Sequence, residues 1–139
     1  MRKVLFVCTA NSCRSQMAEG FARNLGKGVI EPHSAGLIAV EIQPRAIQVM
    51  LEEGIDMSVQ IPKELDVREM NDMDFVITLC PNAERYAPAT PPHVRRLYWP
   101  VKDPVGTVGT EEEILGEFRR ARDEIKEKIL ALVSILKLG

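Results

Sequence analysis

The feature that most constrains this chain is a strand-loop-helix unit near its start. The continuous apolar run at residues 4–7 predicts a short buried strand. A polar stretch at 8–15 follows, in which five residues separate Cys8 from Arg14. An apolar face then recurs at helical spacing as far as Gly26, through Met17, Phe21 and Leu25. The unit predicts a compact loop between a buried strand and the N-terminus of an amphipathic helix.

This loop brings a cysteine, an arginine and a helix N-terminus close together. Backbone N–H groups at a helix start bind tetrahedral oxyanions, and the same field favours a thiolate over a thiol. Arg14 suits two oxygens of such an anion, because a guanidinium donates in a bidentate fashion. Asn11 tolerates a left-handed backbone, and the Ser15 hydroxyl can donate to the Cys8 sulfur. We therefore expect Cys8 to be a thiolate nucleophile within an oxyanion-binding loop of Thr9, Ala10, Asn11, Ser12, Cys13, Arg14 and Ser15.

A plainer interpretation of the same residues stays open. Cys8 also fits a small buried side chain, and Arg14 fits a surface charge on a helix. The preceding strand, the following helix, Asn11 and Ser15 favour the nucleophile over this alternative. Cys13 lies in the loop itself, and its side chain fits a packing role.

Strands and helices alternate along the rest of the chain. Further strands are expected at 29–36, 75–79 and 95–98, with a proline-rich loop after the third strand. The order predicts a three-layer α/β fold in a single domain, residues 1–139, with a four-stranded parallel sheet and helices on both faces. Ligands bind such sheets beyond the carboxyl ends of the strands. Cys8 and Cys80 each follow a strand, so we expect both at that edge.

Two further helices are expected from their end signals. Pro44 suits the first turn of one, with Gly54 after its end and an inward face of Ile47, Met50 and Leu51. Thr110 and Glu113 form a capping box for a long closing helix. Its apolar residues recur at helical spacing: Leu115, Phe118, Ile125, Ile129, Leu132 and Leu136.

Composition limits the compartment and the partners. A net charge of −2 gives no basic field for nucleic acid, and no apolar run approaches the ~20 residues that span a bilayer. The first strand begins almost at Met1, which leaves no room for a signal peptide. Three cysteines, an odd count, argue against a disulfide framework. We expect a cytoplasmic protein with reactive thiols, no cofactor, and neither a membrane nor a nucleic-acid partner. Since His33 and His93 lack ligand spacing, we also expect no metal site.

The stretch from Cys8 to Gly20 resembles the oxyanion loop of the low-molecular-weight tyrosine phosphatase superfamily. Within it, Ser-Gln-Met-Ala-Glu-Gly after Arg14 is more similar to the thioredoxin-coupled arsenate reductases than to the phosphatases. The resemblance covers essentially the whole chain, through Ser34-Ala35-Gly36, Gly54-Ile55-Asp56, Thr78-Leu79-Cys80 and Asp103-Pro104.

This resemblance implies a thiol-dependent reduction of arsenate to arsenite, with phosphate or sulfate as binding analogues. Asp103, in a sequence that alone would indicate only a turn, becomes the general acid. Cys8 attacks the arsenic of arsenate, Cys80 then attacks the Cys8 sulfur, and arsenite leaves behind a Cys8–Cys80 disulfide. The implied catalytic residues are Cys8, Arg14, Cys80 and Asp103.

The chain differs from these relatives at the positions of the further cysteines, which pass electrons between the reductant and the active site. Thioredoxin-coupled enzymes carry a third cysteine seven residues after the second, where this chain has Ala87. A glutaredoxin-linked variant has one two residues after the second, where this chain has Asn82. Either the reductant attacks a Cys8–Cys80 disulfide directly, or an external thiol resolves the Cys8 adduct. The implied reductant is therefore thioredoxin or another thiol.

A second departure concerns a potassium ion. In some relatives, residues that match Asn11, Glu19 and Ser34 surround that ion, beside an aspartate that is Lys63 here. We expect the Lys63 ammonium to take the ion's place.

Two other functions remain as alternatives. One is a tyrosine phosphatase that works through a Cys8 phospho-intermediate, although no aromatic residues follow the acid loop, where Thr107, Val108 and Gly109 stand. The other is a non-enzymatic module that binds oxyanions or arsenic stoichiometrically. A reductase with residual phosphatase activity is also compatible with the loop.

Overall fold

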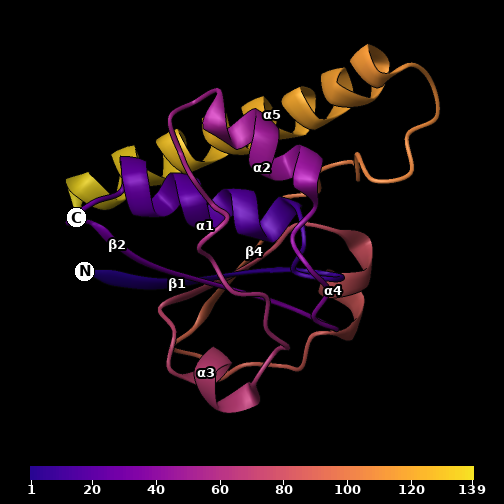
Figure 1. Ribbon diagram of the computed structural model, residues 1–139. Helices are drawn as coiled ribbons and strands as arrows, with labels where there is room; N and C mark the ends of the chain where they lie inside the picture. The colour runs from indigo at the N-terminus through magenta and orange to yellow at the C-terminus, as the bar shows by residue number, and fades with distance from the viewer.

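A computed structural model describes residues 1–139 and contains one sheet of four parallel strands (Figure 1). The strands are β1 (Arg2–Cys8), β2 (Ile30–Gly36), β3 (Phe75–Thr78) and β4 (Arg95–Tyr98), in the order β2-β1-β3-β4. The chain passes from β1 to β2 on one side of β1 and then crosses over to β3 on its other side. The strand order therefore reverses at β1. Val7 of β1 pairs with Ala35 on one side and Thr78 on the other. The predicted sheet is confirmed, and Cys8 at the end of β1 and Cys80 just after β3 both lie at its switch point.

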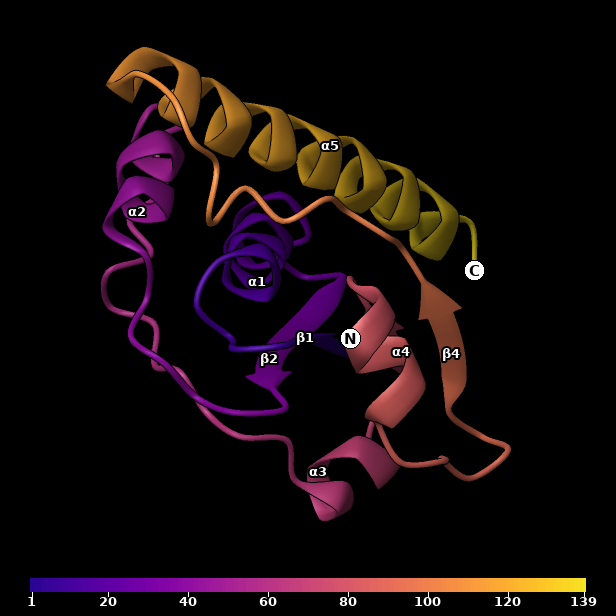
Figure 2. The ribbon, with the colours of Figure 1, turned by 90° about the vertical axis from the view of Figure 1, so that its right-hand side faces the viewer.

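Helices cover both faces of this sheet, as predicted. Figure 2 shows α1 (Arg14–Leu25), α2 (Pro44–Leu51) and α5 (Glu111–Leu138) on one side, with α3 (Val67–Asn71) and α4 (Pro81–Tyr86) on the other. None of these helices combines the length and the apolar character needed to cross a membrane.

The core forms around β1 and the inward helix faces. Residues 4–7 are fully buried, which agrees with the continuous apolar run. The capping box of α5 is confirmed, since Thr110 Oγ1 accepts from Glu113 N and the Glu113 carboxylate accepts from Thr110 N. The predicted face of α2 is partly wrong, because Leu51 is 54% exposed and Val49 is buried with Met50. The helix turns its Ala46, Val49 and Met50 face inward, so Leu51 falls on the solvent side.

Two short helices were not predicted as such. The five-residue α3 buries only Met70, and its Asp66 cap accepts from Arg68 N. Residues 81–86, expected to be a proline-rich loop, form α4 with Pro81 in its first turn. Both helices are too short to show an apolar periodicity. Of the two, α4 matters for the site, because Cys80 is its N-cap residue.

Candidate active site

The loop between β1 and α1 is held from outside by a neighbouring segment of backbone. The carbonyls of residues 8, 9, 10 and 12 accept hydrogen bonds of 2.9–3.2 Å from the N–H groups of Leu37, Ile38, Val40 and Gln43. Asn11 has a positive φ of 51°, as the sequence predicted. The N–H groups of residues 9–13 donate to no atom of the protein. With the carbonyls engaged elsewhere, these donors are free for an anion.

Gly36 lets β2 approach the loop closely enough for this anchoring. A Cβ at this position would lie 2.3 Å from the Ile38 oxygen and 2.6 Å from Asn11 N. No side chain fits there without a shift of the backbone. The Ser-Ala-Gly segment singled out in the sequence therefore has a steric role.

Cys8 lies at the base of this loop, at the carboxyl end of β1. Cys8 is 3% exposed, and its sulfur is 2.8 Å from the Ser15 hydroxyl oxygen, as predicted. The Asn11 amide nitrogen donates to that same oxygen over 2.8 Å. Since the hydroxyl oxygen already accepts there, its single proton is available for the Cys8 sulfur. A donor on the sulfur favours the thiolate form required of a nucleophile.

Arg14 is fixed by the loop that follows β4. Its Nη1 donates to the Val101 carbonyl over 2.9 Å, and its Nη2 is 3.5 Å from Asp103 Oδ2. The Arg14 side chain is 9% exposed, against 48% for Asp103. The guanidinium is thus anchored through one nitrogen, with the predicted general acid beside it. Val101 is a site residue that the sequence did not reveal, because only its carbonyl takes part.

Asp103 lies in the turn expected from its sequence. Its Oδ1 accepts from Val105 N over 3.0 Å, which fixes the carboxylate at the mouth of the cleft. Thr107 N donates to the Pro104 carbonyl, and Gly106 has a φ of 91°. The turn and the proximity to Arg14 place the two predicted residues together.

Cys80 faces the same cleft from the start of α4. It is 2% exposed, and its sulfur accepts a hydrogen bond from Ala83 N at 3.4 Å. The Thr9 hydroxyl oxygen is 3.3 Å from the sulfur. The three cysteines are all free thiols.

A cleft of about 520 Å³ connects these groups. Cys8, Arg14, Cys80 and Asp103 all line it, so the structure brings the four predicted catalytic residues together. None of its 15 lining residues is aromatic. Cys13 also borders the cleft, but burial and the neighbouring Cys8 and Asp103 raise the pKa of its thiol. Cys13 is therefore protonated at neutral pH.

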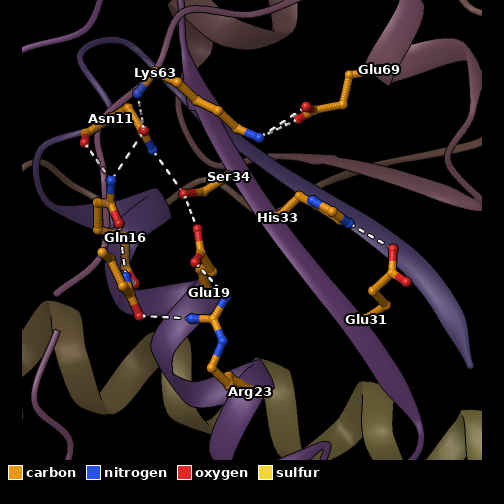
Figure 3. A network of polar contacts seen from close by, with 10 residues as sticks. Asn11, Gln16, Glu19, Arg23, Glu31, His33, Ser34, Lys63 and Glu69 are labelled. Atoms are coloured by element: carbon orange, nitrogen blue, oxygen red, sulfur yellow. Dashed lines mark hydrogen bonds and ion pairs between the residues drawn. The ribbon is translucent and has the colours of Figure 1, made fainter.

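A fully bonded polar cluster supports the loop from its other side (Figure 3). Asn11 Nδ2 donates to Ser34, and Ser34 donates to Glu19 over 2.5 Å. Lys63 N donates to Asn11 Oδ1, but the Lys63 ammonium lies 2.7 Å from Glu69. The expectation that this ammonium takes an ion's place beside Glu19 is wrong. The cation paired with Glu19 is Arg23, at 2.7 Å along the same helix.

Two glutamines of the cluster were not predicted. Gln16, completely buried in the first turn of α1, donates to the Asn11 carbonyl and to Asn11 Oδ1. Gln60, from the segment between α2 and α3, donates to Gln16. His33 pairs with Glu31 on β2 and takes no part. Gln60 is distant in sequence and gives no local signal.

Comparisons with known proteins identify the family to which this geometry belongs. Residues 3–138 match the family described as low molecular weight phosphotyrosine protein phosphatase. An arsenate reductase from Bacillus licheniformis is 45% identical over 128 residues, which cover 92% of each chain. A solved arsenate reductase in the phosphate binding state is similar, with a TM-score of 0.78 and 38% identity over 98% of this chain and 99% of that one.

A phosphatase is also among the similar structures. The arginine phosphatase from Geobacillus stearothermophilus has a TM-score of 0.80 at 25% identity, covering 99% of this chain and 94% of its own. The chain thus belongs to the low-molecular-weight phosphotyrosine protein phosphatase family, as the sequence resemblance indicated.

Proposed function

We propose that this protein is an arsenate reductase in which residues 1–139 form one catalytic domain. The loop N–H groups and Arg14 bind arsenate, and the Cys8 thiolate attacks arsenic. The As–O bond of the leaving group breaks as Asp103 donates a proton, and water departs. The Cys80 thiolate then attacks the Cys8 sulfur, and the electron pair of the S–As bond passes to arsenic. Arsenic(V) becomes arsenic(III), arsenite leaves, and the two thiols end as a disulfide.

The observation that carries this proposal is the placement of a second free thiol, Cys80, on the same cleft as Cys8, while the third, Cys13, is a buried and protonated thiol within the loop. Cys8 ends β1, Cys80 lies just after the neighbouring β3, and both face a cleft that also holds Arg14 and Asp103. A two-electron reduction needs two thiols, whereas phosphoryl transfer needs only one nucleophile. The arsenate reductase named above, at 45% identity, supports the same activity.

The phosphatase alternative has less support. A phosphotyrosine ring is normally bound by stacking on aromatic side chains, and the lining of this cleft provides none. The loop and Asp103 nevertheless suit any small phosphomonoester, so we expect slow hydrolysis of p-nitrophenyl phosphate as a side activity.

We propose that an external thiol, either thioredoxin or a small molecule, reduces the disulfide. All three cysteines of the chain are at most 3% exposed, so none can carry electrons to the surface. A small thiol can enter a cleft of about 520 Å³ as it stands. Thioredoxin, by contrast, presents its thiol on a protein surface and therefore requires the buried disulfide to become exposed. Such thiols persist in reducing compartments, and we therefore place the reaction in the cytoplasm.

The test combines arsenite formation with disulfide mapping. With arsenate and dithiothreitol, the native protein should release arsenite, and without reductant it should accumulate a Cys8–Cys80 disulfide, read by mass spectrometry. Thioredoxin with its reductase and glutathione alone, used in parallel, identify the reductant.

Three serine variants assign the thiols. Cys8→Ser should abolish both arsenite formation and p-nitrophenyl phosphate hydrolysis. Cys80→Ser should abolish thioredoxin-driven arsenite formation and spare the hydrolysis. Cys13→Ser, a matched substitution in the same cleft, should retain the reductase activity. Equal loss of both activities in Cys80→Ser would assign that residue a structural role only.

A further inference from the structure

The hydrogen bonds behind the oxyanion loop run in a single direction. Arg23 Nη1 donates to Gln60 Oε1 over 3.1 Å, and Gln60 Nε2 donates to Gln16 Oε1 over 2.7 Å. Gln16 Nε2 donates to Asn11 Oδ1 over 3.0 Å, and Asn11 Nδ2 donates to Ser15 Oγ over 2.8 Å. Figure 3 shows Arg23, Gln16 and Asn11 following one another along this side of the loop. The series ends at the Cys8 sulfur.

An arginine at the outer end gives the series its direction. A guanidinium donates hydrogen bonds and cannot accept them, so Gln60 must turn its oxygen toward Arg23 and its nitrogen inward. Gln16 must then turn its oxygen to Gln60 and its nitrogen to Asn11. The main chain favours the same orientations, because Gln60 Nε2 also donates to the Gln16 carbonyl and Gln16 Nε2 also donates to the Asn11 carbonyl. Arg23 and these carbonyls together therefore set the direction of the series.

The inner end of the series determines where the Ser15 proton points. Ser15 Oγ accepts from Asn11, and its hydroxyl hydrogen is left to donate to the Cys8 sulfur. A second series of hydrogen bonds leads from Asn11 back to Arg23. Asn11 also donates to Ser34, Ser34 donates to Glu19, and Glu19 accepts from Arg23. Lys63 N supports the same orientation of Asn11 from the main chain.

We propose that Gln60 and Gln16 are positioning residues that act through Asn11 and Ser15 to keep a hydroxyl proton on the Cys8 sulfur. Neither residue lines the cleft, and neither can touch a bound oxyanion. Their role is to favour the thiolate, and the inference rests on the proposed role of Cys8 as nucleophile. Arg23, with a side chain 52% exposed, supports their orientation from the surface, together with the main-chain carbonyls of Asn11 and Gln16.

Gln60→Glu tests the direction of the series. A carboxylate keeps the bond from Arg23 but cannot donate to Gln16 Oε1 or to the Gln16 carbonyl, so both oxygens lose their donor and face the new charge. Gln16 must either shift or turn its nitrogen outward, against its bonds to the two Asn11 oxygens, and in both cases the hold of Asn11 on Ser15 weakens. We expect iodoacetamide to alkylate Cys8 about fivefold more slowly below the pH midpoint, the effect of one lost hydrogen bond. The pH profile should move upward, with Cys8 alkylation read by peptide mass spectrometry.

The charged and titratable groups that face Cys8 across the cleft are unchanged in this variant. They are Arg14 from α1, Cys80 from the start of α4, Cys13 from the loop, and Lys102 and Asp103 from the segment after β4. Gln48→Glu controls for the added charge, because Gln48 is exposed on α2 and its side chain makes no hydrogen bond. It should leave the profile in place.

A double variant separates this mechanism from a general structural effect. In a Ser15→Ala background the series has no route to the sulfur, so Gln60→Glu should produce no further shift. Gln60→Met, which adds no charge, should shift the profile of the native background in the same direction. A shift that persists without Ser15, or an unchanged profile in both Gln60 variants, would overturn the proposal. Alkylation needs no arsenate, so this outcome is independent of whether arsenite forms.

Discussion

The two sides of the oxyanion loop satisfy their polar groups in opposite ways. On the cleft side, the N–H groups of residues 9–13 have no partner in the protein, and Arg14 keeps donors toward Asp103 and the solvent. On the other side, the Asn11 side chain makes two hydrogen bonds through its oxygen and two through its nitrogen. The loop is rigid where it faces the protein, and it leaves donors unpaired only where a ligand will use them.

The largest effect should come from the cleft side, at Arg14. Arg14→Lys keeps the charge but loses the planar guanidinium that contacts Val101 and two oxygens of the anion. We expect kcat/KM for arsenate to fall about 10²–10³-fold, with little change in the melting temperature. Arg68→Lys, on an exposed arginine whose side chain makes no hydrogen bond, is the control. A melting temperature of Arg14→Lys well below that of Arg68→Lys would contradict the division of the loop into a side that binds the ligand and a side that holds the structure.

Asp103 should give the next largest effect. Asp103→Asn preserves an oxygen for Val105 N but cannot donate a proton as a carboxylic acid does. Loss of a general acid should lower kcat about 10²-fold, and the dependence on an acidic group should vanish from the pH–rate profile. Asp56 makes the same local turn through Ser58 N outside the cleft, so Asp56→Asn should be silent. An Asp103→Asn enzyme with normal turnover would exclude the assigned role.

At Gly36, where β2 meets the loop, the effect should be on stability as well as on chemistry. Gly36→Ala places a methyl group within 2.3 Å of the Ile38 oxygen and must displace the loop. We expect a loss of about 1–3 kcal/mol in the free energy of unfolding, measured by urea denaturation. The control is Gly116→Ala, in the second turn of α5, where a Cβ meets open space and should stabilise the helix by about 0.5–1 kcal/mol. Equal free energies of unfolding for Gly36→Ala and Gly116→Ala would show that a side chain at the contact between β2 and the loop costs no stability.

The smallest effect should come from a junction remote from both sides. Hydrogen bonds from Arg119 and Arg122 lower the pKa of Glu52 to about 2, from an ordinary value of 4.5. Because the folded pKa is the lower one, this ion pair stabilises the fold above about pH 4.5 and loses its effect as the pH falls to about 2. Glu52 is 37% exposed, so Glu52→Gln should cost about 1 kcal/mol or less at neutral pH. The difference from the native protein should disappear at the acidic end of a pH series.

The parts of the site that could be predicted are those that lie close together in the sequence. Cys8, Asn11, Arg14 and Ser15 fall within one strand-loop-helix unit, whose geometry follows from the apolar run and the helix start. Family resemblance added Asp103 and Cys80, which come from distant turns.

Other parts could not be predicted because they depend on tertiary packing. Val101 contributes only a carbonyl, and Gln60 reaches Gln16 from 44 residues away. The Lys63 ammonium was misplaced because its pairing with Glu69 depends on how the segment before α3 packs. Leu51 was misplaced because two helix faces of similar apolarity competed.

The anchoring of the loop by main-chain N–H groups has a consequence for sequence variation. Residues 38 and 40 hold the loop through atoms that every amino acid except proline possesses, while their side chains are half exposed. A saturation library at these two positions should therefore accept almost any substitution and lose proline alone. Position 41, whose N–H is not engaged, should accept proline as well. Substitutions that accumulate in this segment can then alter the rim of the cleft, and with it the choice of reductant. The oxyanion loop and its catalytic residues stay in place.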